Sequence, residues 1–347
     1  MRVLLTGAAG FVGSAVAGRL REAGHEVVGV DAFLPQAHGH SPVVPDGVHR
    51  ADVRDPDAWR HLLDGVDAVS HQAAMVGAGT SVADLPLYAA HNDLGTAVLL
   101  ATMSAAGVNR LVLASSMVVY GEGRYSCAEH GDQRPVPRSV AALEEGRFDC
   151  ACPVCGGPLD WALVDEDARS DPRTSYAASK AVQEHFASAW SQQAPGGVVA
   201  LRYHNVYGPG MPRDTPYSGV AAIFRSALEA GVPPRVFEDG AQMRDFVHVD
   251  DVAAANVLAL EQVVRAPTPT FTAYNICSGV PVGIREVAEH VAAGAGSAAA
   301  PIVTGEYRPG DVRHVVASPE RAAAELGFRA RIVPSQGLAR FAHDPLR

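Results

Sequence analysis

Arg2-Val3-Leu4-Leu5-Thr6-Gly7-Ala8-Ala9-Gly10-Phe11-Val12-Gly13 is the stretch that decides the fold. Its apolar start is typical of a strand buried on both faces. A helical pattern then runs from Ser14 to Glu22, and a second apolar run from Glu26 ends at Asp31. Spaced glycines let the backbone turn tightly and approach a pyrophosphate, which rests on the helix N-terminus. This order of strand, glycine loop, helix and strand predicts a dinucleotide-binding unit.

The acidic end of the second strand indicates which dinucleotide is bound. Asp31 follows the glycine loop by roughly 20 residues, where a carboxylate accepts hydrogen bonds from a ribose 2′-hydroxyl and favours NAD over NADP. A plain structural turn is the alternative for a glycine loop alone. We therefore predict NAD as the cofactor, with contacts from Asp31 and from the loop residues Gly7, Gly10, Phe11, Val12 and Gly13.

Strand and helix patterns continue to alternate along the chain. Such alternation predicts an α/β fold with a Rossmann-type, doubly wound parallel sheet. The expected strands cover residues 68–71, 110–115 and 198–202, and the expected helices cover residues 87–106 and 181–190.

Composition excludes several classes of partner. The 347 residues are 48% apolar and 19% charged, with a formal net charge of −10. A negative chain without a basic run is a poor match for duplex nucleic acid or anionic membranes. No apolar run is long enough to span a bilayer, and the first residues do not resemble a signal peptide. We predict a cytoplasmic protein.

Tyr176 and Lys180 form the first candidate catalytic pair. Residues four apart share one face of a helix, and Lys180 is the only lysine in a chain that otherwise uses arginine. A lysine ammonium has a tunable pKa, whereas arginine stays protonated. A chance pair on a helix surface is the alternative. We predict that the two side chains point into one pocket.

About forty residues between Gly121 and Asp165 do not fit the α/β pattern, and a segment of that length should carry its own structure. It contains Cys127 and His130, then Cys152 and Cys155, each pair separated by two residues. Two such pairs suit a tetrahedral structural zinc site, which would supply folding energy to a segment with little core. Cys150 is an alternative ligand in place of His130. The alternative to a metal site is a disordered loop with reduced, solvent-facing cysteines.

Together these motifs resemble the extended short-chain dehydrogenase/reductase family, in its nucleotide-sugar epimerase/dehydratase branch. In the first half, His71-Gln72-Ala73-Ala74 resembles the family's turn under the cofactor, and Ser115-Ser116-Met117-Val118-Val119-Tyr120-Gly121 resembles its catalytic strand end. The resemblance implies cofactor contacts from Asp52, Val53, Gln72, Ala73, Ala74, Asn92, Ser115, Tyr176 and Lys180. It makes Ser116, Tyr176 and Lys180 the catalytic residues.

The second half resembles the sugar-nucleotide part of that branch. In Leu201-Arg202-Tyr203-His204-Asn205-Val206-Tyr207-Gly208-Pro209, the resemblance implies that Tyr203 and His204 lie by the nicotinamide and that Asn205 holds the substrate diphosphate. His204 departs from the family's aromatic residue, so a stacking and a polar role both stay open. The resemblance also implies substrate contacts from Arg244, Arg308 and Asp311 in later motifs. The planar guanidinium groups of the two arginines suit phosphate oxygens.

The resemblance also implies a reaction. Tyr176 would take a proton from the sugar hydroxyl as hydride leaves for NAD⁺, with Ser116 bonded to the same oxygen and Lys180 on the nicotinamide ribose. Dehydratases carry an acid–base pair after the serine, and decarboxylases carry a glutamate two places on. Met117 and Val118 occupy those positions and cannot transfer protons. The expected activity is 4-epimerisation through a transient 4-keto sugar.

The expected substrate is a nucleotide-diphospho-sugar, either a dTDP-6-deoxyhexose such as dTDP-rhamnose or a UDP-hexose. The alternatives are a nucleotide-sugar 4-ketoreductase and a non-catalytic NAD-binding scaffold. Members of this family commonly dimerise through two helices, which here begin near Leu87 and Tyr176. The resemblance therefore implies a homodimer. The expected domains are residues 1–205 for NAD with a return segment at about 236–262, the insertion at 122–164, and a smaller substrate lobe formed by the rest of 206–347.

Overall fold

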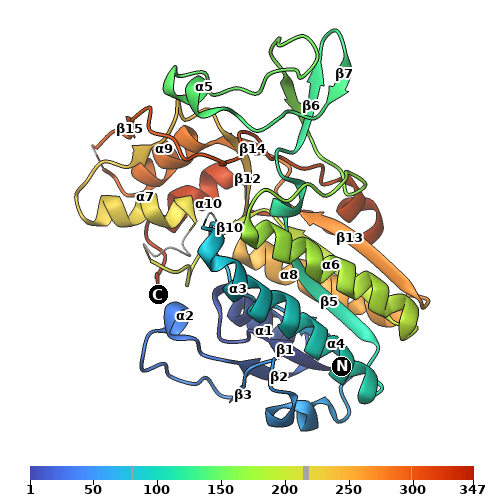
Figure 1. Cartoon of the computed structure of the whole chain (residues 1–347). Coiled ribbons are helices and arrows are strands. Elements are labelled where there is room, and N and C mark those ends of the chain that lie inside the picture. The colour runs from blue at the N-terminus through green and yellow to red at the C-terminus, as the bar shows by residue number, and fades with distance from the viewer. Residues whose placement is uncertain (80, 214–218, 298) are drawn as a thin grey trace.

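A seven-stranded sheet, parallel throughout, forms the centre of the molecule (Figure 1). The computed structural model describes residues 1–79, 81–213, 219–297 and 299–347. From one edge to the other, the strands are β3 (Val48–Arg50), β2 (Glu26–Asp31), β1 (Arg2–Thr6), β4 (Ala68–His71), β5 (Arg110–Ser116), β9 (Gly197–Tyr203) and β13 (Thr270–Ile276). The chain order reverses direction between β1 and β4, which is where open α/β sheets bind ligands.

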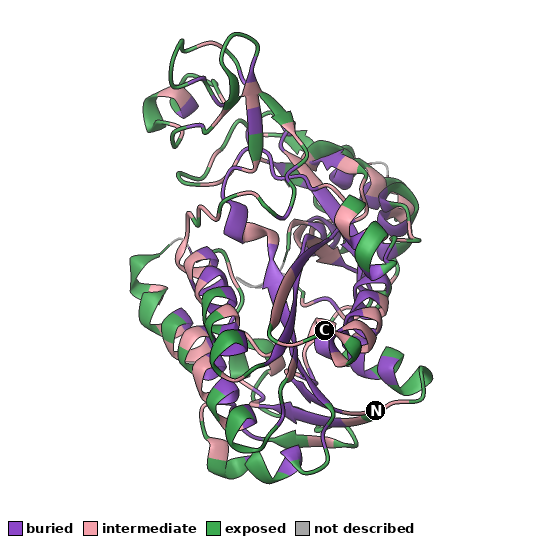
Figure 2. Ribbon diagram, turned by 90° about the vertical axis from the view of Figure 1, so that its right-hand side faces the viewer, coloured by how far each residue is buried: buried purple, intermediate pink, exposed green. Residues whose placement is uncertain are grey.

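Two helical layers cover the sheet, and Figure 2 shows the buried strands between them. One layer holds α1 (Phe11–Glu22) and α8 (Val249–Arg265), which share an apolar core with β1 and β9. The other layer holds α4 (Gly95–Ala105) and α6 (Ser175–Gln193), packed on Trp59. The predicted Rossmann-type, doubly wound sheet is therefore confirmed.

The predicted helix over residues 87–106 exists but is not uniform. It comprises α3 (Leu85–Tyr88), a π-helical segment (Ala89–Leu94) and α4 in direct succession. π-Helical turns inside helices occur frequently at functional sites. The π segment contains the buried Asn92, one of the predicted cofactor residues.

A smaller lobe lies over the carboxyl ends of the strands. Its sheets join β10 (Asn205–Tyr207), β12 (Met243–His248) and β14 (Pro281–Gly283), and separately β11 (Arg235–Val236) and β15 (Ile302–Val303). Its helices α7 (Val220–Glu229), α9 (Ile284–Gly294) and α10 (Pro334–Phe341) pack around Phe224, Phe246 and Phe341.

The predicted return segment needs a correction. The expected range is about residues 236–262, but β12 within that range belongs to the lobe sheet. The residues that return to the main sheet are α8 and then β13, which pairs with β9 from Thr270 to Ile276. This edge strand reads Thr-Phe-Thr-Ala-Tyr-Asn-Ile and mixes polar with apolar residues, so its sequence lacks the continuous apolar run of the central strands.

The insertion forms a small antiparallel sheet at the top of Figure 1. Its strands are β6 (Arg124–Cys127), β7 (Gly131–Gln133) and β8 (Asp160–Ala162), with the short helix α5 (Val140–Glu144) beside them. The other short elements are α2 (Pro35–His38), 3₁₀ turns at Pro56–Ala58, Arg60–Leu63, Val82–Asp84 and Met117–Tyr120, and a π turn at Ala322–Leu326. In the described part of the chain, none of the helices has the length and apolar character required to traverse a bilayer.

Candidate functional site

A cavity of about 1010 Å³ opens between the carboxyl ends of the strands and the lobe. Most of the predicted site residues line it. They are Gly7, Gly10, Phe11, Val12, Gly13, Asp31, Asp52, Val53, Gln72, Ala73, Ala74, Ser115, Ser116, Tyr176, Lys180, Tyr203, His204, Asn205 and Arg308. Asn92, Arg244 and Asp311 do not line it.

The glycine loop is held by contacts between backbones. At Gly13 a Cβ would lie 2.0 Å from the Gly7 carbonyl oxygen, and at Gly7, where φ is +67°, it would lie 2.7 Å from the Ala73 nitrogen. Neither position has room for a side chain. The N-cap of α1 is Gly10, without a side-chain cap and without an acidic residue in the first turn. The amide groups at this helix start are thus suited to an anionic diphosphate.

Asp31 is buried at the end of β2 and is well bonded. Its carboxylate accepts hydrogen bonds from the backbone nitrogens of Ala9 (3.0 Å) and Phe33 (2.8 Å), and His38 Nε2 lies 3.4 Å away. Burial alone would raise the pKa of Asp31, but the hydrogen bonds from His38 and from these amides bring it below its ordinary value. Asp31 is therefore an ionised acceptor fixed at the cavity wall.

Ser116, Tyr176 and Lys180 meet at the ends of β5 and α6. Thr174 caps α6 by accepting a hydrogen bond from Ala177 N, which places Tyr176 in the first turn. Burial raises the pKa of the Tyr176 phenol, while a hydrogen bond with Ser116 opposes that rise. Burial therefore favours the neutral form of the phenol.

The Lys180 ammonium is buried and donates to the Ala114 carbonyl at 2.8 Å. Burial lowers its pKa to about 8, and the Glu184 carboxylate opposes the shift. The only lysine of the chain is thus a tuned ammonium one helical turn from the phenol. Its contact with Ala114 also fixes α6 against β5.

Asn92 lies behind the cavity wall. Its side-chain oxygen accepts from Met75 N (2.7 Å), and its nitrogen donates to Met75 O (3.0 Å) and Ser179 Oγ (2.9 Å). These bonds join the loop after β4 to α6. In this structure Asn92 positions the walls of the site, and its predicted cofactor contact stays a prediction.

Tyr203, His204 and Asn205 follow one another at the end of β9. The Tyr203 hydroxyl donates to Gln72 Oε1 (3.0 Å), and Asn205 donates to the Asp245 carbonyl (3.0 Å). Among the described residues, none meets hydrogen-bond geometry with either ring nitrogen of the buried His204. Burial lowers the pKa of His204 to about 3, so a neutral imidazole faces the cavity.

The predicted substrate arginines are placed differently. The Arg308 guanidinium lies 5.0 Å from the centre of the Phe237 ring and lines the cavity. The Arg244 guanidinium instead donates to the carbonyls of Val312 (2.6 Å) and Arg313 (2.8 Å). Asp311 lies in the same loop, and the substrate contacts of Arg244 and Asp311 stay predictions.

Two residues at the cofactor end were missed by the sequence reasoning. His38, from the short helix α2, lies over Asp31, and no periodicity marks a helix of four residues. The Arg347 guanidinium donates to the Gly10 carbonyl (3.3 Å), the Ala9 carbonyl and Ser14 Oγ (2.7 Å). No local signal could connect a residue of the C-terminal segment to the glycine loop.

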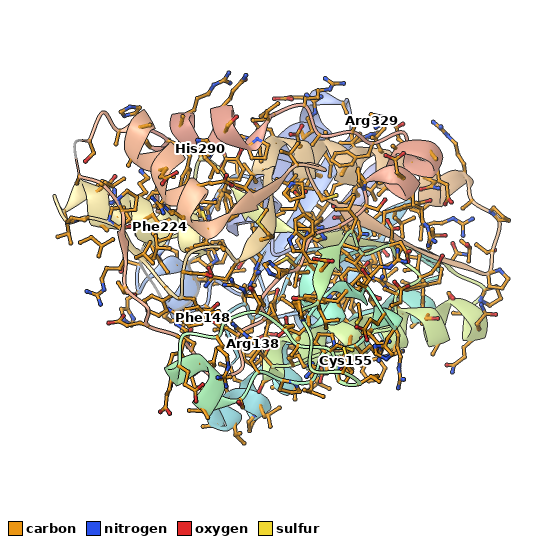
Figure 3. All side chains as sticks on the ribbon, turned by 90° about the horizontal axis from the view of Figure 1, so that it is seen from above. Arg138, Phe148, Cys155, Phe224, His290 and Arg329 are labelled. Carbon is orange, nitrogen blue, oxygen red and sulfur yellow. The ribbon has the colours of Figure 1, made fainter. Side chains whose placement is uncertain are left out.

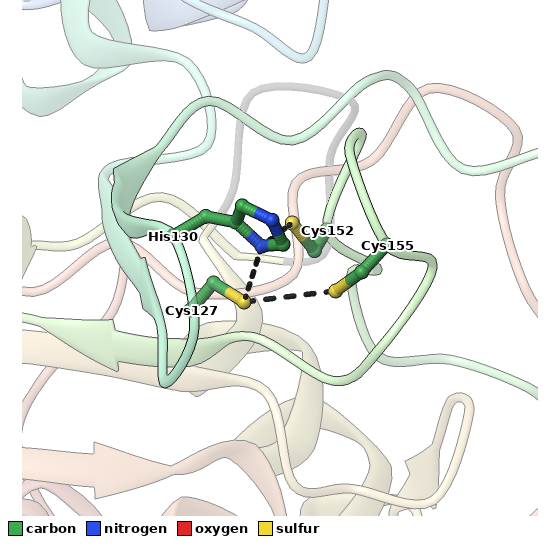
Figure 4. A group of neighbouring side chains, drawn as sticks. All are labelled: Cys127, His130, Cys152 and Cys155. Atoms are coloured by element: carbon green, nitrogen blue, oxygen red, sulfur yellow. Dashed lines mark hydrogen bonds between the residues drawn. The ribbon is translucent and has the colours of Figure 1, made fainter.

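A second site lies in the insertion, where four predicted metal ligands converge (Figure 4). The donor atoms of Cys127, His130, Cys152 and Cys155 lie within 4.8 Å of one another. Cys127 Sγ is 3.5 Å from His130 Nδ1 and 3.8 Å from Cys155 Sγ. With zinc bonds of about 2.3 Å to sulfur and about 2.0 Å to nitrogen, a tetrahedral site has sulfur–nitrogen distances of about 3.5 Å and sulfur–sulfur distances of about 3.8 Å. The donor set fits a tetrahedral metal.

Cys150 is not part of this group. Its buried thiol donates to the Tyr125 hydroxyl at 3.7 Å, and burial raises its pKa to about 12. The alternative in which Cys150 replaces His130 is therefore wrong in this structure. Cys150 instead belongs to the small apolar cluster of the insertion.

Comparisons with known proteins agree with this geometry. Residues 3–140 and 156–277 match the model of the NAD dependent epimerase/dehydratase family. A dTDP-L-rhamnose 4-epimerase of Burkholderia thailandensis is 35% identical, over 97% of this chain and 93% of that protein. A UDP-glucose 4-epimerase of Mycolicibacterium smegmatis is 30% identical, over 98% and 97%. The structure of a Thermus thermophilus UDP-glucose 4-epimerase in complex with NAD superposes with a TM-score of 0.77 at 33% identity, covering 99% of this chain and 98% of that one.

The buried His71 beneath the site predicts a dependence of stability on pH. Its ring nitrogens lie 2.7 Å from Thr6 Oγ1 and 3.0 Å from Thr96 Oγ1, and burial lowers its pKa to about 3. The unfolded chain protonates this residue below about pH 6.5, whereas the folded chain does not. Unfolding therefore takes up a proton in acid, and going from pH 7 to pH 5 removes about 2 kcal/mol of stability through His71 alone.

Denaturant unfolding at pH 7 and pH 5 checks this expectation in wild type and in His71→Asn. The variant is less stable at pH 7 but loses about 2 kcal/mol less than wild type on acidification. The exposed His61 supplies the matched control, and His61→Asn should keep the wild-type difference. An equal loss in His71→Asn and wild type would contradict a neutral, buried His71.

Proposed function

The chain belongs to the NAD-dependent epimerase/dehydratase family, and from that premise we propose that it is an NAD-dependent nucleotide-sugar 4-epimerase. One observation carries the choice within the family. Asp31 and Asp52 are the only carboxylates among the described residues that line the cavity, and both follow strands at the cofactor end. Tyr176 is thus the proton-transfer group beside Ser116, and no acid–base pair for elimination accompanies it in the described lining.

The residues of the chain define the reaction at the sugar. Tyr176 removes the proton of the 4-hydroxyl, and Ser116 donates a hydrogen bond to the same oxygen. NAD⁺, held by Asp31 and the glycine loop, would supply a reversible hydride acceptor for C4 and a positive ring that favours the Tyr176 phenolate. The Lys180 ammonium lies one turn away on the same helix face. Tyr176 then returns the proton to the 4-keto oxygen, so one group serves both directions.

The substrate class follows from the same surfaces. We propose a nucleotide-diphospho-sugar, held by Asn205 and Arg308, either a dTDP-6-deoxyhexose or a UDP-hexose. The relative named as a dTDP-L-rhamnose 4-epimerase supports the first choice, and the relatives named as UDP-glucose 4-epimerases support the second. A cytoplasmic location stays part of this proposal.

Replacement of the phenol tests the proposed reaction. Tyr176→Phe should lower kcat by about a thousandfold, because it removes the general base. The measurement incubates purified protein with a panel of dTDP- and UDP-sugars, without added cofactor, and follows the ratio of 4-epimers. Tyr274→Phe is the control, because that hydroxyl bonds Gln262 and Glu325 away from the cavity. No interconversion by wild type, or equal rates for both tyrosine variants, would refute the epimerase. Turnover only with added reduced cofactor would indicate a ketoreductase.

We also propose that Cys127, His130, Cys152 and Cys155 hold a structural zinc ion. The insertion has a small apolar cluster of five residues, namely Tyr125, Cys127, Cys150, Cys152 and Leu159. Such a cluster contributes little folding energy, and a tetrahedral metal would supply the remainder. The proposed ion is structural, since four protein ligands leave no open position.

Metal analysis of protein purified without added zinc should find about one equivalent. Cys152→Ser should lose most of it, because a ligand is removed. The chain offers two matched controls, since Cys150 and Cys277 lie outside the four-residue group. Cys150→Ser and Cys277→Ser should keep the metal. Full metal content in Cys152→Ser would remove this ligand assignment.

We further propose a homodimer through the helical layer formed by α3, α4 and α6. Leu85 of α3 (45%) and Phe186 of α6 (41%) are exposed, as are Val82 in the 3₁₀ turn before α3 (78%) and Leu94 in the π segment before α4 (53%). Exposed apolar side chains that form a patch mark an interface. A second copy of the chain would bury the same face on both partners.

Light scattering should give twice the chain mass for wild type and a single chain mass for the Leu94→Glu/Phe186→Glu double variant, because two charges would be buried at the interface. Val232 in the lobe is similarly exposed, at 51%, and Val232→Glu should leave the mass unchanged. A dimeric double variant would place the interface elsewhere.

A further inference from the structure

The insertion is bonded to the loop that carries Arg308, at several points along it. The Tyr125 hydroxyl accepts a hydrogen bond from His314 N (3.0 Å), and Glu122 Oε2 accepts one from Arg313 N (2.7 Å). Arg138 Nη2 donates to the Asp311 carbonyl at 2.7 Å. The segment after Arg308 is therefore fixed by residues of the insertion.

Glu238 is the centre of this contact. It is 2% exposed and adopts φ = +54°, a left-handed conformation that residues with a Cβ rarely adopt. Its carboxylate pairs with Arg138 at 2.9 Å and with Arg313 at 2.8 Å. A buried carboxylate with two guanidinium partners is compensated in charge and in hydrogen bonds. The two arginines thus stabilise Glu238 in this unusual backbone conformation.

The backbone of Glu238 holds the start of the Arg308 loop. Its nitrogen donates to the Glu306 carbonyl (2.7 Å), and its carbonyl accepts from Gly305 N (3.2 Å). The preceding residue, Phe237, carries the ring over which Arg308 lies at 5.0 Å. Arg308 is the one arginine among the described residues that line the cavity. Glu238 is thus connected to Arg308 through Phe237 and through the backbone of Gly305 and Glu306.

Arg138 is itself held by the insertion. It lies between the two ligand pairs in the chain, and its Nη1 donates to the Phe148 carbonyl at 2.9 Å. Figure 3 labels Arg138 and Phe148 in the same part of the molecule as Cys155. Burial alone would lower the pKa of Arg138, but the Glu238 carboxylate raises it above its ordinary value. The guanidinium is therefore a fixed positive charge at the contact.

We propose that the Cys/His insertion positions the substrate-binding arginine: Arg138 fixes Glu238, and Glu238 fixes Arg308 for the diphosphate of the nucleotide sugar. This inference rests on the proposed function, because it needs a diphosphate at Arg308. Arg138 is a positioning residue, since it does not line the cavity. It therefore affects nucleotide affinity through Arg308 and leaves the NAD end of the site unchanged.

A double-mutant cycle read out by calorimetric binding of UDP and of dTDP tests this, because it needs no turnover. The proteins are NAD-loaded wild type, Arg138→Met, Arg308→Met and the double variant. We expect Arg138→Met to weaken binding about tenfold, which is within the range of coupling between residues of one hydrogen-bond and salt-bridge network. The double variant should bind no more weakly than Arg308→Met alone. Arg147→Met is the control, because Arg147 is exposed and pairs with Glu145 within the same insertion.

Bound NAD and metal content should stay at wild-type levels in Arg138→Met, and Arg138→Lys should recover part of the affinity because it keeps a charge opposite Glu238. Unchanged affinity in Arg138→Met would overturn the proposal, as would losses that simply add in the double variant. If Arg138→Met does not fold, Arg138→Lys enters the same cycle with the same criteria. A wild-type protein that binds neither UDP nor dTDP would instead refute the proposed function.

Discussion

The close approach of backbones around the glycine loop is the constraint on which the rest of the structure depends. Gly13 lies so near the Gly7 carbonyl, and Gly7 so near Ala73, that neither position accepts a Cβ. This contact brings the start of α1 beside the loop after β4 at the switch point of the sheet. The glycine loop therefore lines its part of the cavity with backbone, and the catalytic side chains Ser116, Tyr176 and Lys180 come from the end of β5 and the start of α6.

A buried polar network joins the end of β5 to α6. Arg202 binds the Glu184 carboxylate through Nε (2.9 Å) and Nη2 (2.8 Å), and its Nη1 donates to the Tyr120 hydroxyl (2.8 Å). Ser115 Oγ donates to the same carboxylate at 2.5 Å. A buried ion pair is tolerated when its remaining donors and acceptors are bonded, as here. Glu184 also favours the charged form of Lys180. This network therefore helps to keep a positive charge on the helix that carries Tyr176.

Local patterns predicted the central sheet, the glycine loop with Asp31, and the pair Tyr176 and Lys180, because glycine spacing, buried apolar runs and a four-residue spacing each report on nearby structure. The other predicted lining residues were implied by the family resemblance. The same patterns could not place β13, whose mixed composition suits an edge strand, nor Arg347, which reaches the glycine loop from 338 residues away in sequence. They also predicted four metal ligands by spacing. They could not decide between His130 and Cys150 as a ligand, because that choice depends on how the fold brings β6 to the turn that carries Cys152 and Cys155.

The attachment points of the insertion place both of its ends near catalytic residues in the chain. It leaves the main domain just after Ser116 and the turn Met117–Tyr120, and it returns before Tyr176 at the start of α6. Both ends are therefore anchored beside catalytic residues. Glu122, its first residue, and Arg138, farther along it, contact the lobe. These contacts join the insertion to the lobe, and the buried Arg138–Glu238 pair favours this arrangement over a shifted one, because a shift would leave a buried charge unpaired.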